Sequence, residues 1–105
     1  MTAVISLESP VIDAALLSRR ETVILYFGAP WCGPCRSMSP MLAGVADAHP
    51  EKILLVKINI DEHPDLVTSE GISSVPVVKI YRDGALTQTL LGAVMRDEMV
   101  RALEV

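Results

Sequence analysis

The sequence predicts an α/β fold in which a central mixed five-stranded sheet is flanked by four helices. Two observations lead to this prediction. Short apolar runs, typical of buried strands, alternate with segments whose apolar residues recur every three or four positions, as on one face of a helix. The resulting order, β-α-β-α-β-α-β-β-α, predicts parallel strands in the first half of the chain and an antiparallel hairpin near its end.

Composition bounds the size and the class of the protein. The chain has 105 residues and half of them are apolar, so we expect residues 1–105 to form a single domain without disulfide staples. The net charge of −4 argues against nucleic acids and anionic membrane surfaces as partners. No apolar run approaches the roughly 20 residues of a membrane span, and Met1 to Leu7 lacks the features of a secretory signal. We therefore expect a soluble cytoplasmic protein.

The first elements are a strand, a helix and a second strand. Residues 3–7 have the pattern of a short strand. Ser9-Pro10 has the residue types of a helix start, because serine caps free amides and proline is tolerated at the first helical position. We expect this helix to run from Val11 to Ser18. The continuous apolar run from Val23 to Phe27 suits a strand buried on both faces.

The middle of the chain predicts a helix, a strand and a short helix. The first helix has one apolar stripe, formed by Met38, Met41, Leu42, Val45 and Ala46. The strand from Lys52 to Ile60 follows, and together with the preceding strand it completes a right-handed βαβ unit. A short helix from Pro64 to Glu70 should stop at Gly71.

The last third of the chain predicts a hairpin and a final helix. Val77 to Tyr81 and Leu86 to Leu91 are two strands separated by Asp83-Gly84, a strong hairpin signal. The final helix should bury one stripe, formed by Met95, Met99, Ala102 and Leu103. Its other face should meet water and carries Arg96, Asp97, Glu98 and Arg101.

Only two cysteines are present, Cys32 and Cys35, and they stand between a predicted buried strand and a predicted helix. A pair so close in sequence cannot staple distant parts of a fold. Cys32 at a helix start would meet unpaired backbone amides and the positive end of the helix dipole, both of which favour the reactive thiolate.

The spacing of the two cysteines suits a dithiol that reacts with disulfides. Cys35 lies almost one helical turn after Cys32, so the sulfurs can approach each other. Gly33 lets a partner come close, and Pro34 leaves no N–H unsatisfied in the first turn. Cys32 would attack a substrate disulfide, and Cys35 would then attack Cys32 and release the reduced substrate.

Two structural readings of the cysteine pair compete with this one. A Cys-x-x-Cys pair is half of many zinc sites, but such sites usually need four ligands. Only His49 and His63 remain as candidates, without finger-like spacing, and we expect both to be solvated surface residues. A structural disulfide in so tight a loop is the other alternative.

The segment from Phe27 to Arg36, with Trp31-Cys32-Gly33-Pro34-Cys35 at its centre, resembles the active-site signature of the thioredoxin family. The resemblance extends over essentially the whole chain. Further matches are Pro40, Lys57, Asp61, Gly71-Ile72, Val75-Pro76, Asp83-Gly84 and Gly92. It implies a thioredoxin fold, a cis Val75–Pro76 bond, and a loop at Pro76 that packs beside the two sulfurs.

The resemblance also implies a shallow apolar surface on which substrates dock. Its members would be Trp31, Gly33, Ile60, Ser74, Val75, Gly92 and Ala93. The Val75 backbone would pair with an extended substrate chain. Core packing is the alternative for Trp31 and for Val75.

Two positions depart from the family pattern. The family usually has a buried aspartate where Tyr26 stands, often paired with the lysine that matches Lys57, and that carboxylate helps to move the proton of the second thiol. Tyrosine has an ordinary pKa of about 10, which makes it a poor base at neutral pH. Lys57 or a bound water could take over, or deprotonation of Cys35 could be slower. Tyr26 could instead fill the space below the site and make a hydrogen bond, which we favour. Gly28, where many relatives carry a large aromatic residue, should reduce packing behind the cysteine loop.

The resemblance implies a monomeric reducing carrier of electrons. It would need no metal or cofactor of its own, and a thioredoxin reductase would recharge it with electrons from NADPH. An oxidising or isomerising relative is one alternative, distinguished by its redox potential. A binding module that does not need its thiols is another, although a scaffold has no chemical use for the intact Cys-Gly-Pro-Cys segment.

Overall fold

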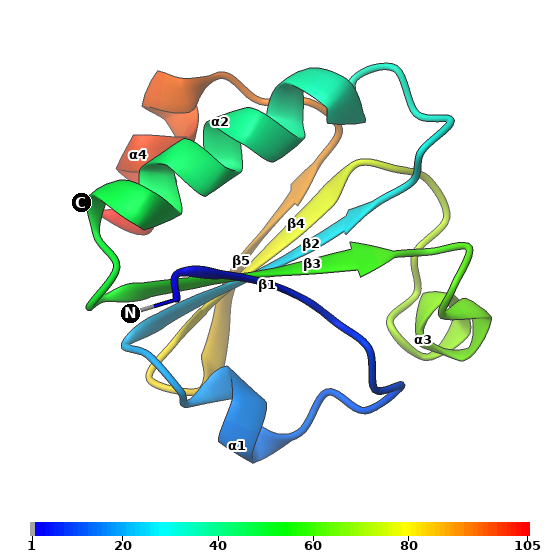
Figure 1. The fold of residues 1–105 in the computed structure, drawn as a ribbon, viewed down its shortest axis with the longest axis horizontal. Coiled ribbons are helices and arrows are strands. Elements are labelled where there is room, and N and C mark those ends of the chain that lie inside the picture. The colour runs from blue at the N-terminus through cyan, green and yellow to red at the C-terminus, as the bar shows by residue number, and fades with distance from the viewer. Residues whose placement is uncertain (1) are drawn as a thin grey trace.

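A computed structural model of the protein describes residues 2–105 and shows one sheet with helices on both faces (Figure 1). The sheet order is β1-β3-β2-β4-β5. The strands are β1 (Val4–Ser6), β2 (Thr22–Gly28), β3 (Ile53–Asn59), β4 (Val77–Arg82) and β5 (Ala85–Leu91). The helices are α1 (Ala14–Leu17), α2 (Cys35–Ala48), α3 (Pro64–Ser69) and α4 (Arg96–Leu103). The predicted five-stranded sheet and four helices are confirmed.

The centre of the sheet is β2, whose seven residues are all buried. It pairs in parallel with β3 and antiparallel with β4, and β1 joins the other side of β3 in parallel. The continuous apolar run in the sequence reflects this position, because a central strand covered on both faces has no side that meets water. The parallel first half and the antiparallel second half are both as predicted.

Each face of the sheet is covered by two helices, α2 and α4 on one face and α1 and α3 on the other (Figure 1). The face under α2 and α4 buries Tyr26, Met38, Leu42, Met99 and Leu103 together with both cysteines. The opposite face forms a second apolar cluster around Phe27. The two cysteines are therefore packed into the first cluster.

Two helix starts away from the cysteine pair differ from the prediction. The first helix begins at Ala14 rather than Val11, because the Asp13 carboxylate, not Ser9, accepts the free amide of the first turn, from Leu16 at 2.9 Å. The last helix begins at Arg96, so Met95 precedes it and is 75% exposed instead of lying on the buried stripe. Both errors concern the end of an element, where local signals compete.

The hairpin and the end of α3 follow the turn chemistry of the sequence. Asp83 and Gly84 have φ values of 52° and 84°, and a two-residue turn with positive φ at both positions matches the twist of the strands it joins. Gly71 follows α3 with a φ of 69°, a conformation that favours glycine. Both predicted signals are confirmed.

His63 does not lie on the surface as expected. It is only 7% exposed, and its Nε2 atom lies 2.8 Å from the carbonyl oxygen of Leu7. The segment after β1 passes over the start of α3, so a residue 56 positions away covers the imidazole.

The longest helix, α2, has 14 residues, and no helix within residues 2–105 combines the length and apolar character needed to cross a membrane.

Candidate active site

The segments that carry the predicted site residues leave the sheet at the same end of its strands. Phe27 on β2 pairs with Val77 on β4, and Val77 pairs with Leu91 on β5. Gly28 at the end of β2 pairs with Asn59 at the end of β3. The segments after β2, β3 and β5 and the segment before β4 therefore emerge at the same end of the sheet, near the start of α2 (Figure 1).

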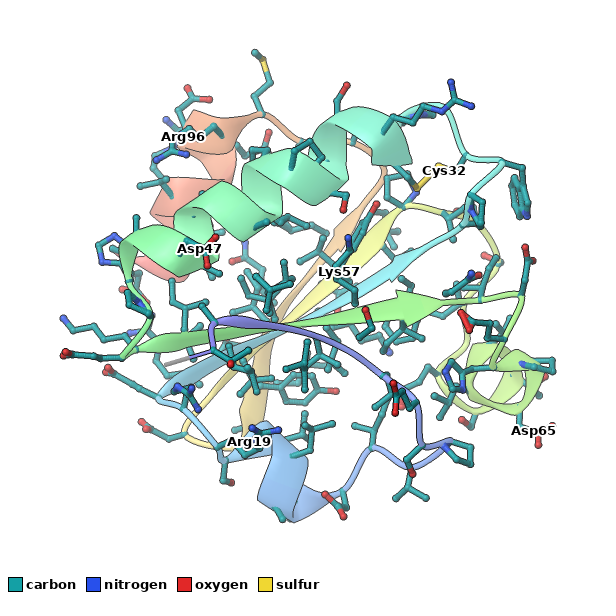
Figure 2. All side chains as sticks on the ribbon, viewed as in Figure 1. Arg19, Cys32, Asp47, Lys57, Asp65 and Arg96 are labelled. Carbon is teal, nitrogen blue, oxygen red and sulfur yellow. A yellow bond between two sulfur atoms is a disulfide. The ribbon has the colours of Figure 1, made fainter. Side chains whose placement is uncertain are left out.

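The two cysteines are bonded to each other in the segment between β2 and α2. Their Cα atoms are 5.3 Å apart, and each residue is 5% exposed. Figure 2 places Cys32 beside the first turn of α2. The close approach of the sulfurs that the spacing predicted is therefore present, and the pair can exist as a disulfide.

The helix α2 begins later than predicted. Cys35 is the first residue of α2 and Pro34 is its N-cap, so Cys32 lies outside the helix. The backbone N–H of Cys35 nevertheless points at the sulfur of Cys32, with an N to Sγ distance of 3.3 Å. A donor at a helix N-terminus favours negative charge on its acceptor. This amide therefore provides the physical reason why a thiolate at Cys32 is stabilised.

Gly33 and Pro34 lie on the outer side of the loop and are exposed. A Cβ atom added at Gly33 would meet no atom of the chain within 4 Å. The glycine is therefore not required by crowding inside the protein, and a side chain there would only stand in the way of a partner.

Trp31 is a surface residue and not part of the core, since it is 65% exposed. Its indole Nε1 donates to both carboxylate oxygens of Asp61, at 3.0 and 3.3 Å. Asp61 comes just after β3, and its backbone N–H donates to the side chain of Asn59. Asp61 was not among the predicted site residues, although an acidic residue that directly follows a strand paired with β2 is a signal for such a role.

The loop before β4 carries the cis Val75–Pro76 bond that the resemblance implied. Pro76 is buried, and its carbonyl oxygen accepts the N–H of Gly92 at 2.9 Å. Val75 is half-buried against the first apolar cluster. Ser74 and Ala93 are exposed. The hydrogen bond from Gly92 joins two of the loops in the expected docking surface.

Ile60 is the remaining member of the expected docking surface. It is half-buried and its backbone N–H donates to the carbonyl oxygen of Gly28 at 3.0 Å. This bond ties the segment after β3 to the end of β2. The expected docking residues thus come from segments that meet at one end of the sheet.

Tyr26 is buried beneath the start of α2. It is 3% exposed, and its hydroxyl donates to the carbonyl oxygen of Cys35 at 3.2 Å. Burial raises the pKa of the Tyr26 phenol above its ordinary value, because the charged form loses its hydration. The side chain stays a neutral donor at neutral pH, in agreement with a residue that fills space and makes a hydrogen bond.

The two departures from the family pattern, Tyr26 and Gly28, form one unit. A Cβ atom at Gly28 would lie 2.9 Å from the Tyr26 hydroxyl oxygen and 3.0 Å from the ring carbon that bears it. The phenol therefore lies directly over the glycine, and any side chain there would displace it. Gly28 thus does more than reduce packing, because it makes room for Tyr26.

Lys57 lies next to Tyr26, since the two residues are register partners on β3 and β2. Figure 2 shows the Lys57 side chain on the side of the sheet that faces α2. Between β3 and the start of α2 lies a cleft of about 330 Å³, which the sequence did not suggest. Its polar lining includes Tyr26, Cys35, Arg36, Ser39, Lys57 and Glu62.

The comparisons with known proteins agree with this geometry. The family profile described as Thioredoxin matches residues 3–105. Thioredoxin 1 of Synechococcus elongatus is 34% identical over 103 residues, which are 94% of this chain and 96% of that protein. The chloroplastic M-type thioredoxin of Chlamydomonas reinhardtii is 37% identical over 89 residues, 85% of this chain and 64% of that protein.

A solved structure supports the fold. A mutant thioredoxin from Halobacterium salinarum superposes with a TM-score of 0.85 at 23% identity, over 99% of this chain and 92% of that one. The fold, the bonded cysteine pair and the sequence relatives agree. The chain belongs to the thioredoxin family and is a thioredoxin-type dithiol–disulfide oxidoreductase.

Proposed function

We propose that the protein reduces disulfides in protein substrates, with Cys32 as the nucleophile and Cys35 as the resolving thiol. The observation that carries this division of roles is the Cys35 N–H, which lies 3.3 Å from the Cys32 sulfur. This donor lowers the free energy of a thiolate at Cys32. Cys35 sits in the first turn of α2 and has no such donor at its own sulfur among the hydrogen bonds of residues 2–105.

Each step of the reaction is a thiol–disulfide exchange. The Cys32 thiolate attacks one sulfur of the substrate disulfide, and the other substrate sulfur leaves as a thiolate that takes up a proton. The Cys35 thiol then loses its proton and attacks Cys32. The substrate leaves with both sulfurs reduced, and two electrons have passed from the dithiol, which ends as the Cys32–Cys35 disulfide.

The edge of the sheet around the disulfide would receive the substrate. Trp31 and Gly33 are exposed on one side of the cysteines, and Val75 on the cis-proline loop would offer its backbone to an extended chain. Ile60, Ser74, Gly92 and Ala93 would complete the surface. Asp61 would hold the Trp31 indole in place through its two short contacts.

Replacing Cys35 with alanine is expected to trap substrates as mixed disulfides on Cys32. The first attack needs only Cys32, whereas release needs the second thiol. Mass spectrometry of the intact adducts after incubation with an oxidised protein such as insulin would detect them. The matched variant Cys32→Ala should trap nothing. If the Cys32→Ala protein formed adducts on Cys35 and the Cys35→Ala protein formed none on Cys32, the roles of nucleophile and resolving thiol would be reversed.

The pH dependence of release offers a test of Tyr26. The pKa of Tyr26 is raised by burial, so the phenol stays protonated from pH 5 to well above neutrality and should add no inflection to the rate profile. Tyr26→Phe should therefore keep the shape of the wild-type profile.

Tyr26→Asp should instead add an inflection. Burial raises the pKa of a carboxyl above its ordinary value of about 3.9, and only the ionised form can accept a proton. The rate of Cys35 attack should then rise with pH through that pKa. A Tyr26→Asp profile that coincides with that of Tyr26→Phe would show that position 26 takes no part in proton transfer.

Recharging would come from a thioredoxin reductase that draws electrons from NADPH, and the protein would need no cofactor of its own. The Gly33-Pro34 pair between the cysteines supports a reducing role over an oxidising one. Equilibration with glutathione buffers would measure the redox potential. A potential well above that of the cytosolic glutathione pool would instead identify an oxidant or isomerase.

A reducing cycle of this kind needs a compartment that keeps thiols reduced, and we place the protein in the cytoplasm. The chloroplast is the alternative, because the similar relatives include chloroplastic thioredoxins of Chlamydomonas reinhardtii and Oryza sativa. Cell fractionation with an antibody to the protein would distinguish the two.

A further inference from the structure

We propose that the cleft beside Cys35 binds a small monocarboxylate anion, and that this anion accepts the proton of the resolving thiol. The proposal rests on the assignment of Cys35 as the resolving thiol. It concerns the cleft between β3, the segment after β2 and the start of α2, on the side of the disulfide where Lys57 lies (Figure 2).

The cleft has room for such a ligand. Its volume of about 330 Å³ lies at the lower end of the range of small-molecule sites. Cys35, Tyr26 and Gly28 all contribute to its wall. The space over Gly28 is taken by the Tyr26 phenol, so the ring and its hydroxyl form part of the wall beside Cys35.

The charges that line the cleft favour a single negative charge. Lys57 and Arg36 are cationic and Glu62 is anionic, which leaves one excess positive charge. Neither Lys57 nor Arg36 takes part in an ion pair among residues 2–105. Lys57 is half-buried, and an ammonium that has lost part of its hydration gains most from an anion at close range.

The wall also contains neutral donors for carboxylate oxygens. Ser39 on α2 lines the cleft, as does Ser6, which is the register partner of Lys57 on β1. An anion held between Lys57 and Ser39 would lie between β3 and α2, in the same cleft as Cys35.

The resolving step has no proton acceptor at Tyr26. The phenol donates its own hydrogen to the Cys35 carbonyl, and burial raises its pKa. In the proposed step the bound carboxylate takes the proton of the Cys35 thiol and becomes the carboxylic acid. The Cys35 thiolate then forms a bond to the Cys32 sulfur while the bond from Cys32 to the substrate breaks. No electron passes to the carboxylate.

Binding can be measured apart from the reaction. Titration of the isotope-labelled disulfide form with sodium formate, at constant ionic strength set by sodium chloride, should give saturable NMR shifts of residues that line the cleft. Lys57→Met should weaken binding about tenfold, because a charge-assisted contact is lost. Lys52→Met is the matched control, since Lys52 is exposed just before the other end of β3, and it should leave binding unchanged.

The kinetic arm uses the uncharged disulfide 4,4′-dithiodipyridine, which releases one coloured thione at each exchange step. In stopped flow, the second release should accelerate on the order of tenfold with formate, as a modest case of general base catalysis. The acceleration of the second release should reach its plateau at the formate concentration that saturates the NMR shifts. The first release should not respond. Lys57→Met should abolish the saturation, and Glu62→Gln should preserve it.

The outcomes separate this proposal from the one on which it rests. Failure of formate to bind, or shifts away from the cleft, would overturn the carboxylate site. Binding without acceleration of the second release would overturn the role as proton acceptor. A Glu62→Gln protein with a slow second release that formate does not restore would make Glu62 the base instead. If Cys35→Ala kept the second release, the assignment of Cys35 itself would fail.

Discussion

Replacing Cys32 with alanine is expected to abolish disulfide reduction, with a loss on the order of a thousandfold or more, as for the removal of other catalytic nucleophiles. The chain contains one other thiol, Cys35. That thiol is the first residue of α2, and it supplies the amide that points at the Cys32 sulfur rather than receiving such a donor itself. Reduction of insulin by dithiothreitol, followed by turbidity, measures the rate.

The control for this prediction is the fold of the variant. Cys32→Ala and the reduced wild-type protein both lack the disulfide, so their urea unfolding midpoints should be similar. Comparing the variant with the oxidised protein would confuse the loss of the nucleophile with the loss of a cross-link. A folded Cys32→Ala protein that kept a rate within about tenfold of wild type would contradict the assigned nucleophile.

Replacing Tyr26 with alanine is expected to cost about 3–5 kcal/mol of the free energy of unfolding, the usual cost of removing a large buried aromatic side chain. Tyr26 is 3% exposed and belongs to the apolar cluster under α2 and α4. The substitution also leaves the carbonyl oxygen of Cys35 without the hydroxyl that donates to it. Gly28, directly beneath the ring, has no side chain with which to fill the gap. Urea unfolding of the oxidised proteins measures the loss.

The contact between Tyr26 and Gly28 should appear as non-additivity. Gly28→Ala alone should cost about 1–3 kcal/mol, because the new methyl group would overlap the buried phenol. In the Tyr26→Ala background the same methyl group enters free space and should cost little or stabilise. The coupling energy should fall at about 0.5–3 kcal/mol, in the range of directly contacting residues.

A second glycine serves as the matched control for this cycle. Gly44 lies inside α2 and is exposed, and a Cβ atom there would come no closer than 3.8 Å to Arg96. Gly44→Ala should therefore stabilise the protein by about 0.5–1 kcal/mol, equally in both backgrounds. If Gly28→Ala and Tyr26→Ala were additive in their effects, the phenol would not occupy the space above Gly28.

Much of the architecture could be read from local patterns. The run from Val23 to Phe27 identified the central strand, and Asp83-Gly84 identified the hairpin, because both signals depend only on residues that are neighbours in sequence. The start of α1 was missed because Ser9 and Asp13 are both good caps. Sequence alone does not show which of them the surrounding structure lets the helix use.

Some features of the candidate site could likewise be predicted from residues that are neighbours in sequence, and others could not. The cysteine pair and its position before a helix could be predicted, as could the exposed Trp31. The buried state of His63 could not, since its partner Leu7 lies 56 positions away in the chain. The place of Tyr26 over Gly28 and the cleft beside Lys57 were also missed, because they depend on strand register and on the direction of side chains.

Local patterns of residues establish the order of elements, the central strand, the hairpin and the reactive pair Cys32 and Cys35. These follow from periodicity, turn chemistry and spacing, which act over a few residues. Three-dimensional packing sets which amide faces the Cys32 sulfur and how Tyr26 meets the Cys35 carbonyl, and it leaves an open cleft beside Lys57. The physical reason is that space and hydrogen-bond partners are set by the packing of segments distant in sequence, which local patterns do not record.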